Sequence, residues 1–169
     1  ATKKDQAKIC LKDVAEIAKK SPELKKHFRT FWNKDKPTEI VCHPSSGLIS
    51  VLGRDSDTED GLDVSMAIID EWHAHKDTGV RDILSSAMGN RAQPLESIIT
   101  TAGFNLQGPC YTKTRKTCID ILEGVKVDDQ QLILLYEMDN FEDWEDKDQW
   151  VCPNPNLPYS TSTKDALDT

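Results

Sequence analysis

Apolar residues recur at helical spacing near the start of the chain. The segment 3–20 predicts an amphipathic helix, because apolar side chains recur near i, i+4 and i+7 with charges between them. Ser21-Pro22-Glu23 then reads as a helix start, since serine is a favoured cap and proline fits the first helical position. This predicts a second, short helix from Pro22 to about Phe31.

Two short runs with β-type alternation follow this helical region. They lie at 39–43 and 48–52, and Pro-Ser-Ser-Gly at 44–47 joins them. Two such runs around a four-residue turn predict a β-hairpin. The polar stretch 53–63 predicts a loop.

Apolar runs alternate with helical segments in the rest of the chain. The runs at 66–69, 97–101 and 131–136 predict strands, and the first is continuous enough to suggest burial on both faces of a parallel sheet. Helices are predicted from 77 or 78 to 88 and at 108–123, each followed by a glycine. This alternation predicts an α/β fold with mostly parallel strands, in which ligands bind at the carboxyl ends of strands.

Length and composition fit one domain followed by a tail. The chain has 169 residues, and its segment 151–169 is rich in Pro, Asn and Ser, which predicts a linker after a domain at 1–150. No apolar run approaches the roughly 20 residues of a membrane span, and no signal peptide is visible. The five cysteines form no CxxC pair, which favours a reducing cytosol over a disulfide framework.

Charge is distributed unevenly along the chain. The net charge is −8, yet residues 1–36 hold 11 Lys and Arg against 5 Asp and Glu, a balance of +6. The remaining residues hold 10 against 24, a balance of −14. The acidic total disfavours a nucleic-acid binder as a whole, whereas the basic end either faces a polyanion or forms a solvated helix face.

Two carboxylates follow the apolar run at 66–69. Asp70 and Glu71 would stand at the carboxyl end of a buried strand, where the first can bind Mg²⁺ and the second can activate water. An ordinary strand that ends in a polar loop would show the same sequence pattern. About 30 residues downstream, Thr100-Thr101-Ala102-Gly103 ends the next predicted strand and could sense a γ-phosphate, although threonine is also a common strand residue.

Other residues support weaker hypotheses. His73-x-His75-x-Asp77 resembles the start of a dinuclear zinc site, but no histidine lies after position 75 to complete one. Read instead from Asp70, the letters spell a helicase-like D-E-x-H box. Arg91 could be an arginine finger on developing phosphate charge or a structural arginine. None of the eight glycines precedes Lys-Ser or Lys-Thr, so the sequence holds no P-loop.

The motifs together resemble one family. SMAIIDEWHAHKD, AMGNRAQPLESIITTAGF, LEGVKVDD and DWEDKDQWVCPNPNL, in that order, look like the large terminase subunit of tailed bacteriophages and prophages, and ATKKDQAK and SPELKKHF also resemble it. The resemblance covers the chain to about residue 160. It implies a partial ASCE, RecA-like P-loop NTPase sheet from the part of the ATPase domain after the P-loop, without the family's nuclease domain.

The resemblance also implies roles for individual residues. Asp70 is similar to the Walker B ligand of Mg²⁺, and Glu71 to the catalytic glutamate. Thr100, Thr101 and Gly103 match the motif that couples hydrolysis to DNA movement and would contact the nucleotide. Arg91 falls where the family often has a basic residue, and His73 takes the place after D-E-x.

Cofactors, partners and location follow as expectations from the same resemblance. The complete domain would use Mg²⁺ and ATP, with none held tightly by this chain, which is predicted not to hydrolyse ATP alone. Its partners would be double-stranded DNA, the portal protein, the small terminase subunit and further copies in a ring, in the cytoplasm of a bacterial host, without a membrane. A helicase fragment and a degenerate, non-catalytic interaction module remain alternatives.

Overall fold

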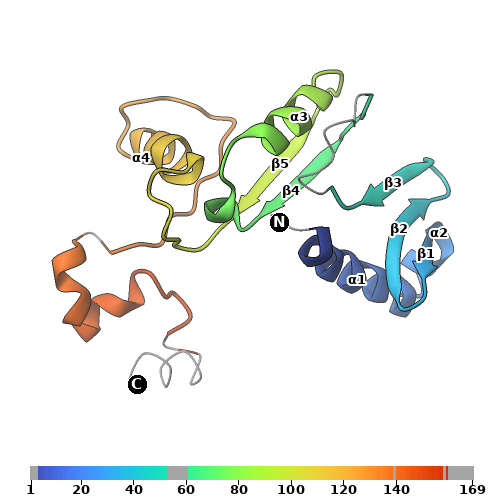
Figure 1. Cartoon of the computed structure of the whole chain (residues 1–169), viewed down its shortest axis with the longest axis horizontal. Coiled ribbons are helices and arrows are strands. Elements are labelled where there is room, and N and C mark those ends of the chain that lie inside the picture. Colours follow the sequence, from blue (N-terminus) through green and yellow to red (C-terminus); the bar gives the residue numbers. More distant parts are fainter. Residues whose placement is uncertain (1–3, 53–60, 139, 158, 160–169) are drawn as a thin grey trace. The chain divides into compact units, whose positions relative to one another are not determined.

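The computed structural model describes residues 4–52, 61–138, 140–157 and 159 (Figure 1). The chain divides into two compact units, Ala1–Lys116 and Thr117–Thr169. The first unit holds helix α1 and every strand among the described residues.

Helix α1, Lys4–Lys20, confirms the predicted amphipathic helix. Its apolar stripe includes Leu11 and Ala15, which are buried together with Ile40 of strand β2. Phe28 and Val51 pack against this cluster. The helix therefore gains its stability by covering one side of a small sheet, as an amphipathic helix requires.

The predicted helix from Pro22 to Phe31 is wrong beyond its first turn. Helix α2 spans only Leu24–His27, and strand β1 begins at once, over Phe28–Asn33. It runs antiparallel to strand β2, Lys36–Cys42, with Phe28 opposite Cys42 and Asn33 opposite Lys36. The local start signal is real, but pairing with β2 overrides it because the residues after His27 include bulky aromatics that suit a sheet.

The predicted hairpin is confirmed. Strand β3, Gly47–Ser50, pairs antiparallel with β2, and Gly47 lies opposite Cys42. The loop contains Ser46 at φ 55°, and the Ser45 hydroxyl accepts from the Gly47 N–H at 3.2 Å. The resulting sheet has the order β1-β2-β3 and is wholly antiparallel. The expectation of mostly parallel strands is therefore wrong for the described residues, where only β4 and β5 pair in parallel.

Strands β4, Met66–Asp70, and β5, Leu95–Ile99, form the parallel pair, with Asp70 opposite Ile99. Helix α3, Gly79–Ala87, lies between them in sequence and alongside them in space (Figure 1). The arrangement is a βαβ unit. The fold is thus mixed α/β.

Burial on both faces of β4 is not observed. Ala67 and Ile69 are buried, whereas Met66 and Ile68, which point to the other face, are 54% and 61% exposed. The reason is that helix α3 covers one face, so the strand alternates between a buried and an exposed side. The buried side chains pack with Trp72, Leu84, Met88 and Cys110.

The predicted helix at 108–123 is confirmed with a change of winding. A π-helical stretch at Cys110–Arg115 leads into α4, Lys116–Leu122. Gly124 follows at φ 73°, a left-handed conformation that glycine adopts without strain at a helix end.

The predicted strand at 131–136 is wrong, since these residues have no regular structure. Leu132 and Leu134 are 90% and 72% exposed, and without a hydrogen-bonded neighbour an apolar run does not form a sheet. The second unit instead contains 3₁₀ turns at Phe141–Glu145 and Lys147–Val151. The role of 151–169 as a linker stays a prediction.

No helix among the described residues combines the length and apolar character needed to cross a bilayer. All five cysteines carry free thiols.

Candidate functional site

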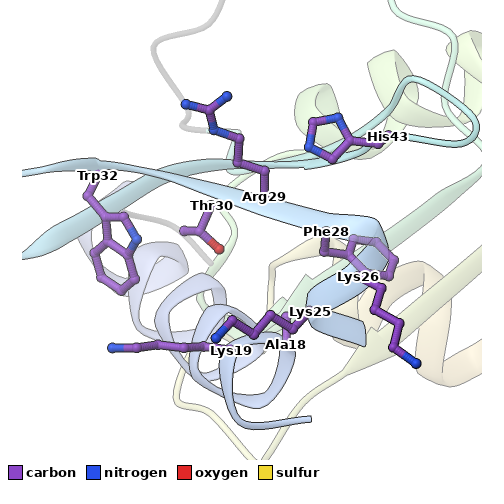
Figure 2. Close-up of a pocket in the computed structure, with 9 residues that line it drawn as sticks. All are labelled: Ala18, Lys19, Lys25, Lys26, Phe28, Arg29, Thr30, Trp32 and His43. Atoms are coloured by element: carbon purple, nitrogen blue, oxygen red, sulfur yellow. The ribbon is translucent and has the colours of Figure 1, made fainter. Parts of the chain in front are cut away.

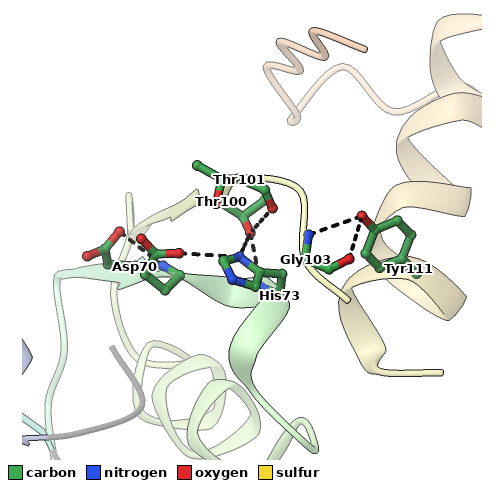
Figure 3. Close-up of polar contacts among 7 residues, drawn as sticks. Asp70, His73, Thr100, Thr101, Gly103 and Tyr111 are labelled. Carbon is green, nitrogen blue, oxygen red and sulfur yellow. Dashed lines mark hydrogen bonds and ion pairs between the residues drawn. The ribbon is translucent and has the colours of Figure 1, made fainter. Parts of the chain in front are cut away.

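Strand β4 ends in an abrupt change of backbone direction at its two carboxylates (Figure 3). Glu71 has φ 55° and ψ 48°, in the left-handed region that non-glycine residues rarely adopt. The Asp70 carboxylate accepts the Glu71 N–H at 3.0 Å, which helps to hold this conformation. Such backbone strain clusters at functional sites and persists only where surrounding contacts enforce it.

His73 connects the end of β4 to the loop after β5. Its backbone N–H donates to the Thr100 hydroxyl at 3.0 Å, and its ring Nδ1 lies 3.0 Å from the same oxygen. The Glu71 carboxylate is 3.3 Å from Nδ1. Glu71, His73 and Thr100 therefore form one continuous polar contact across the carboxyl ends of both strands (Figure 3).

The Thr100 hydroxyl contacts both the backbone and the ring of His73. A threonine hydroxyl has a single proton, and here it is donated to the Thr101 carbonyl at 3.1 Å. Which group donates in the contact between the Thr100 hydroxyl and Nδ1 of His73 depends on the tautomer of the ring. Nδ1 of His73 also faces the Glu71 carboxylate.

Gly103 passes directly against the His73 ring. A Cβ built at this glycine would lie 2.7 Å from Cγ and 2.9 Å from Cβ of His73, closer than real side chains approach. The Tyr111 hydroxyl lies 3.3 Å from both the N–H and the carbonyl oxygen of Gly103. The glycine is needed here for close approach, and the tyrosine holds the loop in that position.

Trp72 anchors the turn after strand β4 through its buried side chain. It begins the 3₁₀ turn Trp72–Ala74, its side chain is fully buried, and its Nε1–H donates to the Thr114 hydroxyl at 2.9 Å. The ring of His75 packs against it with centroids 5.0 Å apart. The polar residues on either side of Trp72 are therefore carried on a rigid, buried support.

Arg91 lies at the other end of the β4–β5 sheet. Its guanidinium contacts the Asp63 carboxylate at 2.6 Å and the Asp63 carbonyl at 3.0 Å. Both residues precede their strands, and a five-residue strand spans roughly 16 Å. Arg91 is thus not brought together with Glu71 within this chain, and its catalytic role stays a prediction.

The strand-end residues predicted from the sequence do lie together. Asp70, Thr100, Thr101 and Gly103 occupy the carboxyl edge of the parallel pair (Figure 3), and Glu71 directly follows Asp70 in the chain. Sequence reasoning missed the central place of His73 and the parts played by Tyr111 and Trp72. The D-E-x-H spacing was a signal for His73, whereas nothing in the sequence pairs Tyr111 with Gly103.

The donor set at this edge suits Mg²⁺ bound to phosphates. Asp70 and Glu71 offer carboxylate oxygens, and Mg²⁺ typically takes one or two carboxylates together with waters and phosphate oxygens. A histidine metal centre is not supported: within the ranges that the structure describes, no group of three His, Cys, Asp or Glu side chains could hold a metal ion. His73 is engaged by Thr100 instead, and His75 packs on Trp72.

Comparison with known proteins identifies the family of this chain. The family described as "Terminase large subunit, ATPase domain" matches residues 1–117, which is more than half of the chain. The chain belongs to the terminase large subunit ATPase-domain family. The resemblance found in the sequence is therefore confirmed at the level of the family.

Two similar proteins show how much of a longer molecule the chain spans. Protein YmfN of Escherichia coli K12 is 38% identical over 101 residues, which is 60% of this chain and 22% of YmfN. The crystal structure of the HK97 bacteriophage large terminase matches 97% of the chain with a TM-score of 0.75 at 20% identity, over 33% of its own length. The chain thus spans about a fifth and a third of these proteins, and the second likeness establishes the fold.

Proposed function

We propose that this chain supplies the hydrolytic edge of a terminase motor ATPase. The observation that supports the proposal most directly is the contact from Glu71 through His73 to Thr100 across the carboxyl ends of β4 and β5. Ligands of parallel α/β sheets bind at this edge. The finer fold assignment, a partial ASCE-type P-loop NTPase sheet, belongs to the same proposal.

Asp70 is the proposed ligand of Mg²⁺, directly or through water. One of its carboxylate oxygens accepts the Glu71 N–H, which fixes the carboxylate at the strand end. Bound Mg²⁺ would neutralise charge on the phosphate oxygens of ATP. The role of Asp70 is then to position a divalent cation without moving during the reaction.

Glu71 is the proposed general base. Its side chain is 43% exposed, so a water molecule can reach the carboxylate, and it accepts the proton that this water loses as it attacks the γ-phosphorus. The left-handed backbone at Glu71 ends the extended conformation of strand β4 directly after Asp70. His73 holds the carboxylate at 3.3 Å, which limits its rotation.

Thr100, Thr101 and Gly103 are the proposed coupling elements. A change in the hydrogen bonding of Glu71 reaches Thr100 through the His73 ring, and Gly103 lies against the same ring. The loop after β5 can therefore respond to the state of the carboxylate. This transmission would link hydrolysis to DNA movement, in a complex with double-stranded DNA, portal protein, small terminase subunit and further copies of the chain in a ring.

Two further parts of the proposal concern the chain as a whole. Its 169 residues contain no P-loop motif, so we expect no ATP turnover from this chain alone. Arg91 can meet nucleotide phosphate only in the site of a neighbouring subunit, because it lies at the other end of its own sheet. The site of action would be the cytoplasm of a bacterial host.

The Mg²⁺ dependence of turnover tests the assignment of Asp70. In the protein that carries this sequence in its natural reading frame, Asp70→Asn should raise the Mg²⁺ concentration for half-maximal ATP turnover about tenfold or more, because a ligand charge is lost. Glu123→Gln, at an exposed position, is the matched control and should leave that concentration unchanged. An unchanged Mg²⁺ requirement in Asp70→Asn would remove Asp70 from the metal site.

A helicase fragment shares the D-E-x-H letters, and a degenerate interaction module needs no catalytic residue. The family match to residues 1–117 favours the terminase assignment over a helicase. An interaction module predicts partner binding that is indifferent to Asp70→Ala and Glu71→Ala.

A further inference from the structure

One helical segment contacts both the turn after β4 and the loop after β5. It is the π-helical stretch Cys110–Arg115, and Cys110 itself is buried in the core cluster that includes Trp72. Tyr111 packs against the same cluster. A π-helical turn is rare, and it is most often a single turn inserted into an α-helix at a functional site. The segment thus combines an uncommon winding with a place beside the proposed site of hydrolysis.

The first contact of the segment holds the loop after β5. The Tyr111 hydroxyl accepts the Gly103 N–H and donates to the Gly103 carbonyl oxygen, each at 3.3 Å (Figure 3). A single hydroxyl therefore pairs with both backbone groups of this glycine. Gly103 is also the residue whose close approach to the His73 ring leaves no space for a Cβ. The Tyr111 hydroxyl thus fixes how the loop lies against His73.

The second contact holds the turn after β4. The Thr114 hydroxyl accepts the indole N–H of Trp72 at 2.9 Å, and the Trp72 side chain is fully buried. Because an unpaired N–H in the core is costly, this bond keeps the turn Trp72–Ala74 against the segment. Tyr111 and Thr114 are three residues apart, so one element holds both the turn and the loop.

His73 lies between these two contacts. It follows Trp72 in the chain, and its ring lies against Gly103. Its Nδ1 is 3.3 Å from the Glu71 carboxylate and 3.0 Å from the Thr100 hydroxyl. A shift of the turn or of the loop relative to the segment therefore alters the contacts of Glu71, the proposed base.

We propose that Tyr111 and Thr114 are positioning residues of the hydrolytic site, which hold the turn after β4 and the loop after β5 in register through the π-helical segment. The inference rests on the proposed function, because it adds two residues to the machinery of the same edge. Both residues act through Trp72, His73 and Gly103 rather than on the reacting atoms. The rate of the chemical step should therefore depend on their hydroxyl groups, whereas nucleotide binding should not.

The segment is separate from the basic hollow of the first unit. That hollow has a volume of about 430 Å³ and lies where the end of α1, helix α2 and strand β1 meet (Figure 2). Its described lining includes Lys19 and Lys25, and no lining residue belongs to Cys110–Arg115. Substitutions at Tyr111 and Thr114 leave this charged surface as it is, so a change in turnover after them does not come from lost positive charge.

Hydrogen–deuterium exchange tests the first contact without ATP. In the protein that carries this sequence in its natural reading frame, Tyr111→Phe removes the hydroxyl and keeps the ring. Exchange at the Gly103 amide should accelerate about tenfold, because the amide loses its acceptor. Tyr159→Phe is the matched control, since it removes the same hydroxyl from a residue that is 88% exposed. Equal exchange at Gly103 in the wild-type and Tyr111→Phe proteins would overturn the proposal.

The turnover rate per nucleotide-binding site tests the positioning role. With ATP turnover divided by the number of sites that bind nucleotide, Tyr111→Phe should lower kcat about tenfold and leave the KM for ATP within about twofold. A merely structural role would reduce the number of binding sites and leave the rate per site unchanged. That result would overturn the proposal, and Tyr159→Phe should retain both the number of sites and the rate.

Thr114 supplies a second pair of variants. Thr114→Val removes the acceptor of the Trp72 N–H and should also lower kcat per site, whereas Thr114→Ser keeps the hydroxyl and should retain most of the rate. Equal rates per site in these two variants would overturn the role of Thr114.

Failure of this inference is distinguishable from failure of the proposed function. Full turnover in Glu71→Gln would contradict the assignment of the base. A loss in Glu71→Gln together with full turnover per site in Tyr111→Phe and Thr114→Val would contradict the positioning role alone.

Discussion

The two ends of the β4–β5 sheet both carry polar and charged side chains, but these side chains make different contacts. At the carboxyl ends, Glu71 contacts His73, His73 contacts Thr100, and Gly103 lies against the ring. At the amino ends, Asp63 and Arg91 form a single surface ion pair. The His73–Thr100 and Asp63–Arg91 contacts join positions 27 and 28 residues apart, because both bridge the same βαβ unit.

The difference lies in how each end is supported. The carboxyl end rests on the fully buried Trp72 and includes a strained backbone at Glu71, whereas Asp63 and Arg91 are 65% and 40% exposed. Strain is maintained only where packing enforces it. A carboxylate or an arginine near a strand is therefore informative only once its place along the strand and its support are known.

The largest effect is expected where the support is removed. Trp72→Ala should lower the free energy of unfolding by about 3–5 kcal/mol, because it deletes a buried aromatic side chain and leaves the Thr114 hydroxyl without its donor. Urea unfolding followed by far-UV circular dichroism measures the change. Trp144→Ala, at a side chain that is 56% exposed, is the control and should cost far less. Similar losses in the two variants would contradict the proposed anchor.

A smaller effect is expected where the loop after β5 passes against His73. Gly103→Ala should lower the free energy of unfolding by about 1–3 kcal/mol, since the new methyl group overlaps the His73 side chain. Gly79→Ala is the matched control, because its Cβ would meet only the Asp77 carboxylate at 3.3 Å. In a His73→Ala background, Gly103→Ala should lower the free energy of unfolding by less than in the wild-type chain. An equal loss in the two backgrounds would show that the His73 ring is not the obstacle.

The smallest effect is expected at the opposite end of the sheet. Arg91→Ala should lower stability by less than about 1 kcal/mol, because an exposed ion pair gains little over solvation. Thermal unfolding at 0.05 M and 0.5 M NaCl measures the difference, which should shrink at the higher salt concentration. If Arg91→Ala lowered the free energy of unfolding by more than about 2 kcal/mol at both salt concentrations, the two ends of the sheet would contribute similarly to stability.

Local patterns predicted most of the helices, the hairpin and one strand of the parallel pair. Helix α1, the β2–β3 hairpin, strand β4 and the helices around 78–88 and 108–123 followed from periodicity and turn residues. Strand β1 was not predicted, because the helix signal at Ser21-Pro22-Glu23 is local and does not include the pairing of Phe28 with strand β2. The apolar run at 131–136 failed for the complementary reason, since a strand needs a hydrogen-bonded neighbour.

The sequence predicted which residues lie at the ends of the two strands, but not the contacts between their side chains. Asp70, Glu71, Thr100 and Gly103 could be placed at one edge because parallel strands share their carboxyl ends. The position of Arg91 depends on where β5 begins, two residues earlier than predicted. The contact of Tyr111 with Gly103 is tertiary, and no periodicity encodes it.

The most direct test of the central claim is the rate of Mg²⁺-dependent ATP turnover in the protein that carries this sequence in its natural reading frame. Glu71→Gln keeps the size of the side chain and removes the base, so turnover should fall about 10²–10⁴-fold while nucleotide binding persists. Glu123→Gln should retain the full rate. Turnover that is equal in the Glu71→Gln and wild-type proteins would contradict the assignment of the β4–β5 edge as the site of hydrolysis.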